Sequence, residues 1–208
     1  MHFEQLFDLS SGGMPGALHV KRALDETWTD LKSDPQKIAA LARGEMTPAL
    51  PLRFIWSMGE IPMDQITTAL VKVHIFSERV FECFRHNRFT GWSTFPVEIT
   101  GRHGTSIPNY RGLAVTGRCG QIDSTRSVRT ARPPRKQEGD ADIMMGLYFD
   151  PDSWDGSHIF TPGAKIFVVE DVKTALEEIK ATNIRFRPLT EMENHQATLR
   201  LRDSAEKR

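Results

Sequence analysis

The stretch EDVKTALEEIKATNIRFRPL, residues 170–189, lies without gaps over ERVFECFRHNRFTGWSTFPV, residues 78–97. Four positions are identical (Glu, Val, Thr and Pro), and several others carry residues of similar kind. In the earlier stretch Val80 and Phe84 have the i, i+4 spacing that places apolar side chains on one helix face, and the later stretch repeats it. Each stretch therefore predicts a helix that runs into a strand.

The residues after each predicted helix also correspond. Gly91 and Asn183 occupy matching positions, and these residue types tolerate the positive φ with which a helix reverses. Pro96 and Pro188 fall late in the predicted strands, where a missing N–H does least damage on a sheet edge. Because the matching residues belong to a helix face, a helix end and a strand edge, we interpret the repeat as structural and not as a duplicated set of reactive groups. It predicts two similar helix-plus-strand units in one domain, with Gly91 and Asn183 both in the left-handed conformation.

Size and composition restrict the class of protein. The chain has 208 residues, enough for a sizeable core, and its 27 basic and 27 acidic residues leave no net field toward nucleic acid or lipid. The N-terminus lacks the pattern of a secretory signal, and no window reaches the roughly 18 apolar residues of a membrane span. Cys83 and Cys119 are expected to be free thiols in a reducing compartment. We therefore expect a cytoplasmic protein with no membrane contact.

The N-terminal fifty residues are predicted to be helical. GALHVKRALDETWTDLK, residues 16–32, places apolar residues near one face at helical spacing. A second helix is expected to begin at Pro35 with Asp34 as its N-cap and to end before Gly44. The expected class is α+β: a helical N-terminal extension (1–50), an α+β body (51–190) that holds the two units, and a charged flexible tail (191–208).

The sequence offers little for catalysis or for metal and cofactor binding. The seven histidines show no zinc-binding spacing, so neither a metal nor a cofactor is expected. His103, in the turn GRHGTS, could serve acid–base chemistry, although an exposed histidine in a hairpin turn is the far commoner explanation. Arg118 beside Cys119 could lower the pKa of that thiol, but the sequence names no base to activate it. A small enzyme that uses His103 and Cys119 is therefore an alternative, and no catalytic residue is assigned.

The most polarised segment is the basic loop at 118–136, which contains only one acidic residue, Asp123. Its default interpretation is a solvated loop, although its cations could contact phosphates or an acidic protein face. Because no aromatic residue interleaves them, nucleic acid is not the expected partner, and a nucleic-acid-associated regulator is a further alternative. Trp154, in the turn-rich connection that follows, could be an aromatic anchor for a protein partner. The candidate partner-binding residues are Arg118, Arg126, Arg129, Arg132, Arg135 and Trp154, with Lys136 adding a sixth cation to the loop.

Four stretches together resemble a known family: GEIPMD, then IFSERVFECFRHNRFTGWSTFPVEI, then YRGLAVTGRCGQIDSTRS, and finally GLYFDPDSWDGSHIFTPGAKIFVVEDVKTALEEIKATNIRFRPL. They are similar to a myxobacterial-type family of bacterial immunity proteins linked to polymorphic toxins, formerly a domain of unknown function. The resemblance covers about residues 54–190. Its features are a Ser-Glu helix start at 77–78, a Tyr, Asp and Ser stretch at Tyr110, Asp123 and Ser127, and a terminal helix-plus-strand unit.

This resemblance implies a cytoplasmic antidote that binds and blocks a cognate toxin without catalysis. The family pattern supplies no catalytic residues to carry over. The expected mechanism is steric occlusion of the toxin's active site by a preformed surface, with charges that steer association. A homo-oligomer is compatible with this function, and the first fifty residues are not covered by the resemblance.

Overall fold

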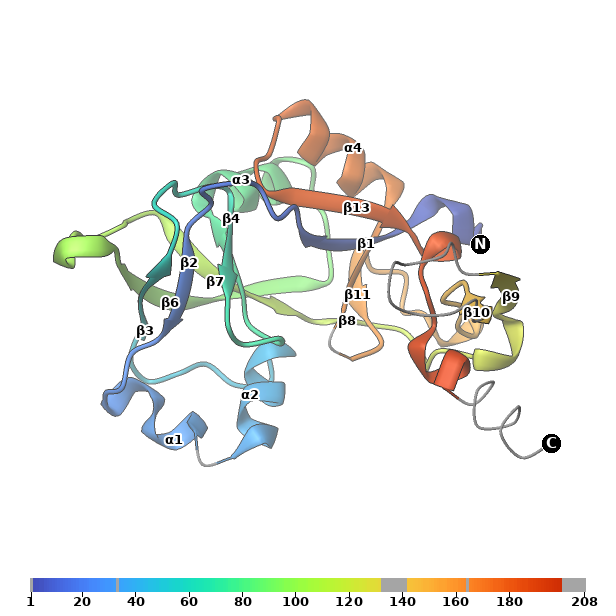
Figure 1. Ribbon diagram of the computed structural model, residues 1–208, viewed down its shortest axis with the longest axis horizontal. Helices are drawn as coiled ribbons and strands as arrows, with labels where there is room; N and C mark the ends of the chain where they lie inside the picture. The colour runs from blue at the N-terminus through green and yellow to red at the C-terminus, as the bar shows by residue number, and fades with distance from the viewer. Residues whose placement is uncertain (1, 33, 132–141, 164, 200–208) are drawn as a thin grey trace.

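β-Strands dominate the computed structural model of the protein, which describes residues 2–32, 34–131, 142–163 and 165–199 (Figure 1). The strands are β1 (Leu6–Ser11), β2 (His19–Arg22), β3 (Leu52–Met58), β4 (Gln65–Thr68), β5 (His74–Ser77), β6 (Trp92–Thr100), β7 (Tyr110–Val115), β8 (Gly117–Arg118), β9 (Val128–Ala131), β10 (Asp142–Met145), β11 (Ile159–Thr161), β12 (Ile166–Val169) and β13 (Ile184–Pro188). Six of them close into a barrel in the order β2-β3-β6-β7-β5-β4. Five form an open sheet in the order β13-β1-β12-β11-β8, and β9 pairs with β10.

The expected α+β class with a helical N-terminal portion is wrong. The described residues contain 13 strands, and their helices are few and short: α1 (Thr29–Lys32), α2 (Pro35–Ala42), α3 (Glu78–His86), α4 (Glu170–Glu178) and a helical stretch at 195–199. The described part of the N-terminal fifty residues begins with strands, and it supplies β1 to the open sheet and β2 to the barrel. The predicted extension is thus part of both sheets.

The segment at 16–32 shows why the helix prediction failed. Leu18 and Val20 are buried while Lys21 between Val20 and Arg22 is exposed, which is the two-residue alternation of a strand. A segment this short is compatible with both the 3.6-residue period of a helix and the two-residue period of a strand. Pairing with β3 and β4 selects the strand. Helical structure begins only near Trp28, which is buried in the barrel.

The helix at Pro35 is confirmed: the Asp34 carboxylate accepts a hydrogen bond from the N–H of Gln36 at 2.8 Å, and Gly44 follows with φ +71°. Within the expected flexible tail, the described residues 191–199 pack onto the body, with Met192 and Ala197 buried. Residues 200–208 lie outside the described part.

The repeat proves to be larger than a helix and a strand. We call β2, β4, β5, α3, β6 and β7 the first unit, and β8, β11, β12, α4, β13 and β1 the second unit. In the first unit β7 lies between β5 and β6 and is antiparallel to both; in the second, β1 lies in the same way between β12 and β13. The next strands also correspond, because β4 and β2 continue the first sheet as β11 and β8 continue the second.

The two units agree in register as well as in strand order. Leu113 of β7 lies opposite His74 and Thr94. Leu9 of β1 lies opposite Ile166 and Phe186, which are the aligned counterparts of those two residues. The N-terminal strand therefore completes the second unit, although it precedes the whole of the first unit in the chain. The barrel closes because β3 pairs with both β2 and β6.

The contacts between the two units are also symmetrical, because equivalent backbone hydrogen bonds run in both directions. In one direction the N–H of Gln65 donates to the carbonyl of Thr182 at 3.2 Å, and in the other the N–H of Ile159 donates to the carbonyl of Thr90 at 3.1 Å. Gln65 and Ile159 begin the corresponding strands β4 and β11, while Thr90 and Thr182 are aligned in the repeat. Each unit therefore binds the helix-to-strand turn of the other.

The prediction for Gly91 and Asn183 is confirmed, since their φ angles are +89° and +59°. A Cβ atom on Gly91 would lie 1.9 Å from the carbonyl oxygen of Ile159, so only glycine fits that position. Pro188 lies on the edge strand β13, as predicted. Pro96 instead lies where β6 changes partner from β7 to β3, inside the barrel wall.

The helices and cores follow from this pairing of units. Figure 1 shows α3 and α4 together on the upper side, over the sheets, and α1 and α2 on the lower side of the barrel. The shared core under α3 and α4 contains Phe84 from one unit and Leu176 from the other. Separate clusters fill the barrel, around Trp28 and Phe54, and the opposite face of the open sheet, around Phe160 and Phe167.

Candidate functional site

Arg118, the first predicted contact residue, has partners within the chain. Its guanidinium donates to the carbonyl oxygens of Val115 at 2.5 Å and of Gly117 and Arg43 at 3.0 Å each. These bonds join the end of α2 to the β7–β8 connection. The side chain therefore stabilises the join between the units.

Arg126 and Arg129 are also engaged locally. The Arg126 guanidinium lies 5.0 Å from the ring centroids of both Phe3 and Tyr148, and it donates to the carbonyl of Phe149 at 3.3 Å. Arg129 forms an ion pair with Asp142 across the β9–β10 pair. The other predicted arginines, Arg132 and Arg135, lie outside the described residues, as does Lys136.

Trp154 is half-buried and helps to hold the turn at 150–157. Its ring lies 5.4 Å from that of Phe160, and its indole N–H donates to the carbonyl of Ser157 at 3.1 Å. A partner would have to displace these contacts to use the whole ring as an anchor.

His103 and Cys119, the residues of the alternative enzyme hypothesis, are not brought together. His103 is exposed in the turn Arg102–Gly104 of the β6–β7 connection. Cys119 follows β8 and packs against the core of the second unit. Burial, with a smaller contribution from the Asp155 carboxylate, raises the pKa of the Cys119 thiol to about 12. Arg118 does not activate it, and the thiol is protonated at neutral pH.

We expect native Cys119 to resist iodoacetamide at pH 8, because a thiol of pKa about 12 is ionised to only about 1 part in 10,000. Burial also raises the pKa of Cys83, the other free thiol. Mass spectrometry of the labelled protein should show little modification until denaturant is added, after which both cysteines should react. Rapid labelling of Cys119 in the native protein would contradict this environment.

The described residues do not converge on a metal site, and they contain no group of three His, Cys, Asp or Glu side chains placed to hold an ion. No helix among them is long and apolar enough to cross a membrane.

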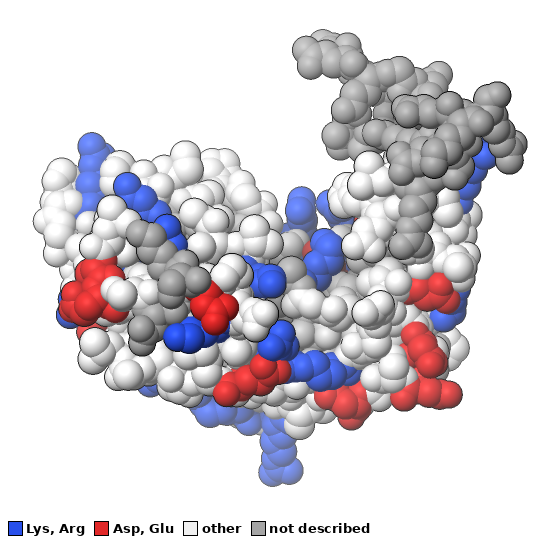
Figure 2. All heavy atoms as spheres, turned by 90° about the horizontal axis from the view of Figure 1, so that it is seen from below, with Lys and Arg blue, Asp and Glu red and all other residues white. Residues whose placement is uncertain are grey.

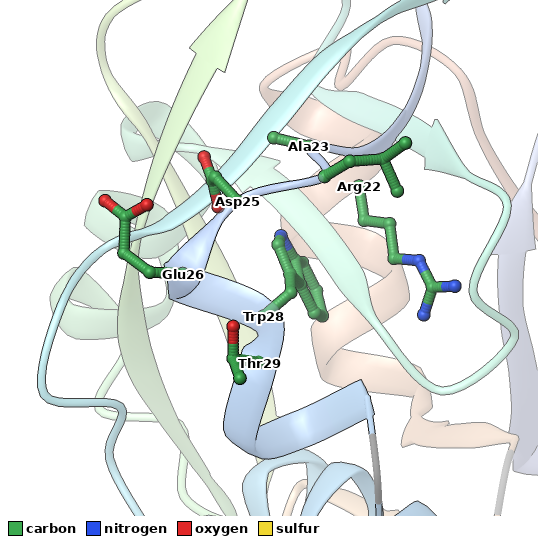
Figure 3. Close-up of a pocket in the computed structure, with 7 residues that line it drawn as sticks. Arg22, Ala23, Asp25, Glu26, Trp28 and Thr29 are labelled. Atoms are coloured by element: carbon green, nitrogen blue, oxygen red, sulfur yellow. The ribbon is translucent and has the colours of Figure 1, made fainter.

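A hollow of about 600 Å³ lies beside the start of α1, lined by residues of a single chain segment (Figure 3). Its residues have structural partners: the Trp28 indole donates to the carbonyl of Arg53 at 2.7 Å, and Asp25 accepts hydrogen bonds from Thr27. In Figure 3 the Arg22 and Glu26 side chains point away from each other. The hollow therefore lacks the convergent polar groups that a ligand site requires.

The open sheet presents a more distinctive surface on the face turned away from α4. Along β1, Phe7 and Leu9 point into the shared core, so Asp8 and Ser10 point to the opposite face. Arg187 lies directly across from Asp8, and Arg185 across from Ser10. Directly opposed residues of antiparallel strands project to the same side, so both arginines share this face.

Lys165 adds a third cation, just before β12. Its ammonium nitrogen lies 3.8 Å from the Asp8 carboxylate, whose side chain is only 8% exposed. Neither Arg185 nor Arg187 has an ion-pair partner among the described residues. We call Asp8, Ser10, Lys165, Arg185 and Arg187 the cationic sheet face.

A cavity adjoins this face. It has a volume of about 210 Å³ and lies between β1, the β4–β5 hairpin and Lys165. Figure 2 shows the corresponding side of the molecule, hollowed between two lobes with Lys and Arg side chains around the hollow. The hairpin contributes Val71, whose side chain is among the most exposed of the large apolar ones. The surface thus combines cations with an apolar rim.

Sequence reasoning missed this face. The alternation Ile184, Arg185, Phe186, Arg187 was visible and marks a strand with one charged side. The positions of Asp8 and Lys165 beside it depend on the pairing of β1 with β12 and β13, which no local pattern shows.

The sequence matches no protein-family model, and no curated protein matches it significantly.

Proposed function

We propose that this protein is an antidote of the immunity type, which binds a cognate protein toxin and blocks it without catalysis. The observation that carries the proposal is the cationic sheet face, which presents two unpaired arginines and adjoins, at Asp8, Ser10 and Lys165, a cavity between the two units. The resemblance described above supports it, because the family-like segments at 78–97 and 170–189 form the corresponding helices and strands of both units.

The proposed mechanism is steric occlusion by a preformed surface. Both units bind the turn of the other and share one core, so little conformational entropy is lost when a partner docks. Cations on the surface would steer an oppositely charged partner and speed association. The proposed compartment is the cytoplasm, supported by two free cysteines, since thiols persist under reducing conditions.

The test is co-purification with a toxin encoded beside this chain's gene. We expect a tagged form of the protein to retain a catalytically disabled toxin domain through gel filtration and to inhibit the active toxin stoichiometrically. An elution profile in which the two proteins separate, together with undiminished toxin activity, would overturn the proposal.

A further inference from the structure

The corresponding faces of the two units differ in chemistry. On the barrel the residues of this face have small or apolar side chains and line the barrel core. On the open sheet the residues at the aligned positions are polar or charged. The aligned pairs are Val73 and Lys165, Ser93 and Arg185, Phe95 and Arg187, Gly112 and Asp8, and Ala114 and Ser10.

On the barrel, the chain itself covers this face. Leu41 of α2 is fully buried, and Ile38 packs on the barrel core. A Cβ atom built on Gly44, just past α2, would lie 2.9 Å from the Ser93 hydroxyl and 3.6 Å from the Ala114 methyl group. The end of α2 therefore lies directly over two of the compared positions.

On the open sheet four of the five corresponding positions are at least partly exposed, and only Asp8 is buried. Arg185 is exposed, the Lys165 side chain is 46% exposed, and Ser10 and Arg187 are half-buried. Covering two unpaired guanidinium groups with an apolar element would leave their charges desolvated, which is strongly unfavourable. An element with carboxylates would instead form charge-assisted, bidentate hydrogen bonds with them.

We propose that an acidic helix of a protein partner occupies, on the second unit, the position that α2 occupies on the barrel. This inference rests on the proposed function, and it assigns the toxin's contact to an acidic helical segment. Carboxylates of the helix bind Arg185, Arg187 and Lys165, while its apolar side packs on the exposed Val71 of the β4–β5 hairpin.

Two features of the face favour an acidic protein segment over nucleic acid. Asp8 lies among the cations and would repel a continuous phosphate backbone. The nearest aromatic ring in register, Phe167, is fully buried and offers no platform for stacking a base. A helix can place its carboxylates beside the cations and away from Asp8.

The first experiment measures fluorescence anisotropy of a fluorescein-labelled helical peptide that carries glutamates on one face and leucines on the other. We expect Arg185→Gln/Arg187→Gln to weaken binding about 10-fold or more, as loss of two interfacial charge pairs implies. The matched control is Arg88→Gln/Lys180→Gln, which removes the same charge at two exposed, unpaired residues of the helix-to-strand turns. It should change the affinity less than about twofold, because distant surface charges are screened.

Equal affinity of the wild type and Arg185→Gln/Arg187→Gln for the peptide would overturn the inference, as would an equal loss in the control variant. A labelled oligothymidine serves as the competing probe. Tighter binding of the oligothymidine than of the peptide, lost in Arg185→Gln/Arg187→Gln, would assign the face to nucleic acid and would also overturn it. Circular dichroism confirms that each variant is folded.

The second experiment repeats the affinity measurement with the toxin. Weaker toxin binding by Arg185→Gln/Arg187→Gln but not by the control supports the inference. Unchanged toxin binding by both variants overturns the inference and leaves the antidote function standing. If the wild type binds no toxin, the proposed function fails, and the assignment of the toxin as occupant fails with it.

Discussion

Removal of residues 1–11 is expected to abolish cooperative folding of the second unit. β1 lies between β12 and β13 and pairs with both, so its loss leaves β13 without its partner strand in the sheet. Phe3, Leu6, Phe7 and Leu9 are all buried. At roughly 2 kcal/mol for each buried apolar side chain, their loss approaches the whole stability of a typical domain. Urea denaturation followed by circular dichroism and tryptophan fluorescence provides the measurement.

A point variant gives a graded form of the same prediction. Leu9→Ala should lower the free energy of unfolding by about 3 kcal/mol, because Leu9 is 2% exposed in the shared core. Leu24→Ala is the matched control; this leucine is 86% exposed, and its change should cost less than about 0.5 kcal/mol. If the shortened chain unfolded at the same urea concentration as the full chain, the N-terminus would be a dispensable extension and the pairing of β1 would be wrong.

Asp64→Asn is expected to destabilise the protein by about 2–3 kcal/mol, as breaking a largely buried ion pair does. The Asp64 carboxylate is 8% exposed and accepts hydrogen bonds from Arg79, Ser77 and Thr182. Thr182 belongs to the second unit, so this one side chain joins the two units at their junction. An asparagine would keep one acceptor and turn a donor toward the donors already there.

The control for Asp64→Asn is Glu98→Gln, which removes an ion pair with Arg53 between side chains that are at least 50% exposed. That change should cost less than about 0.5 kcal/mol. Equal urea midpoints for Asp64→Asn and the wild type would refute a stabilising role for the junction.

Acid provides a second measurement on Asp64. Burial alone would raise the pKa of this carboxyl, but hydrogen bonds from Arg79, Ser77 and Thr182 outweigh it and lower the pKa from 3.8 to about 2. The folded-state pKa is below the unfolded one, so the stabilisation is complete above about pH 4 and is lost as the pH falls toward 2. The wild type should lose on the order of 2 kcal/mol more than Asp64→Asn across this range. Parallel stability curves would contradict the assignment.

Local sequence signals predicted part of the fold correctly. The helix at Pro35 was recognisable because its cap, its first-turn proline and its terminal glycine lie next to one another. The aligned stretches at 78–97 and 170–189 predicted corresponding helices, stops and strands, and the positive φ angles of Gly91 and Asn183 agree. Each of these features depends on residues within a few positions of one another.

Features that depend on distant pairing were mispredicted or missed. Residues 16–32 carry a pattern compatible with a helix, and pairing with β3 and β4 overrides it. The basic loop at 118–136 carries the largest local excess of cations in the sequence, yet Arg118, Arg126 and Arg129 have partners within the chain. Charge in a sequence does not show which cations are already paired.

The sequence by itself determined the two helix-to-strand stretches, because helix faces, stops and strand edges are encoded by short-range spacing. Only the tertiary structure decided that the N-terminal strand completes the second unit and that β3 closes the first unit into a barrel. It also placed Asp8 and Lys165 beside Arg185 and Arg187. Strand order is set by burial and hydrogen bonding between residues far apart in the chain, and periodicity along the chain carries no record of which strand becomes the neighbour.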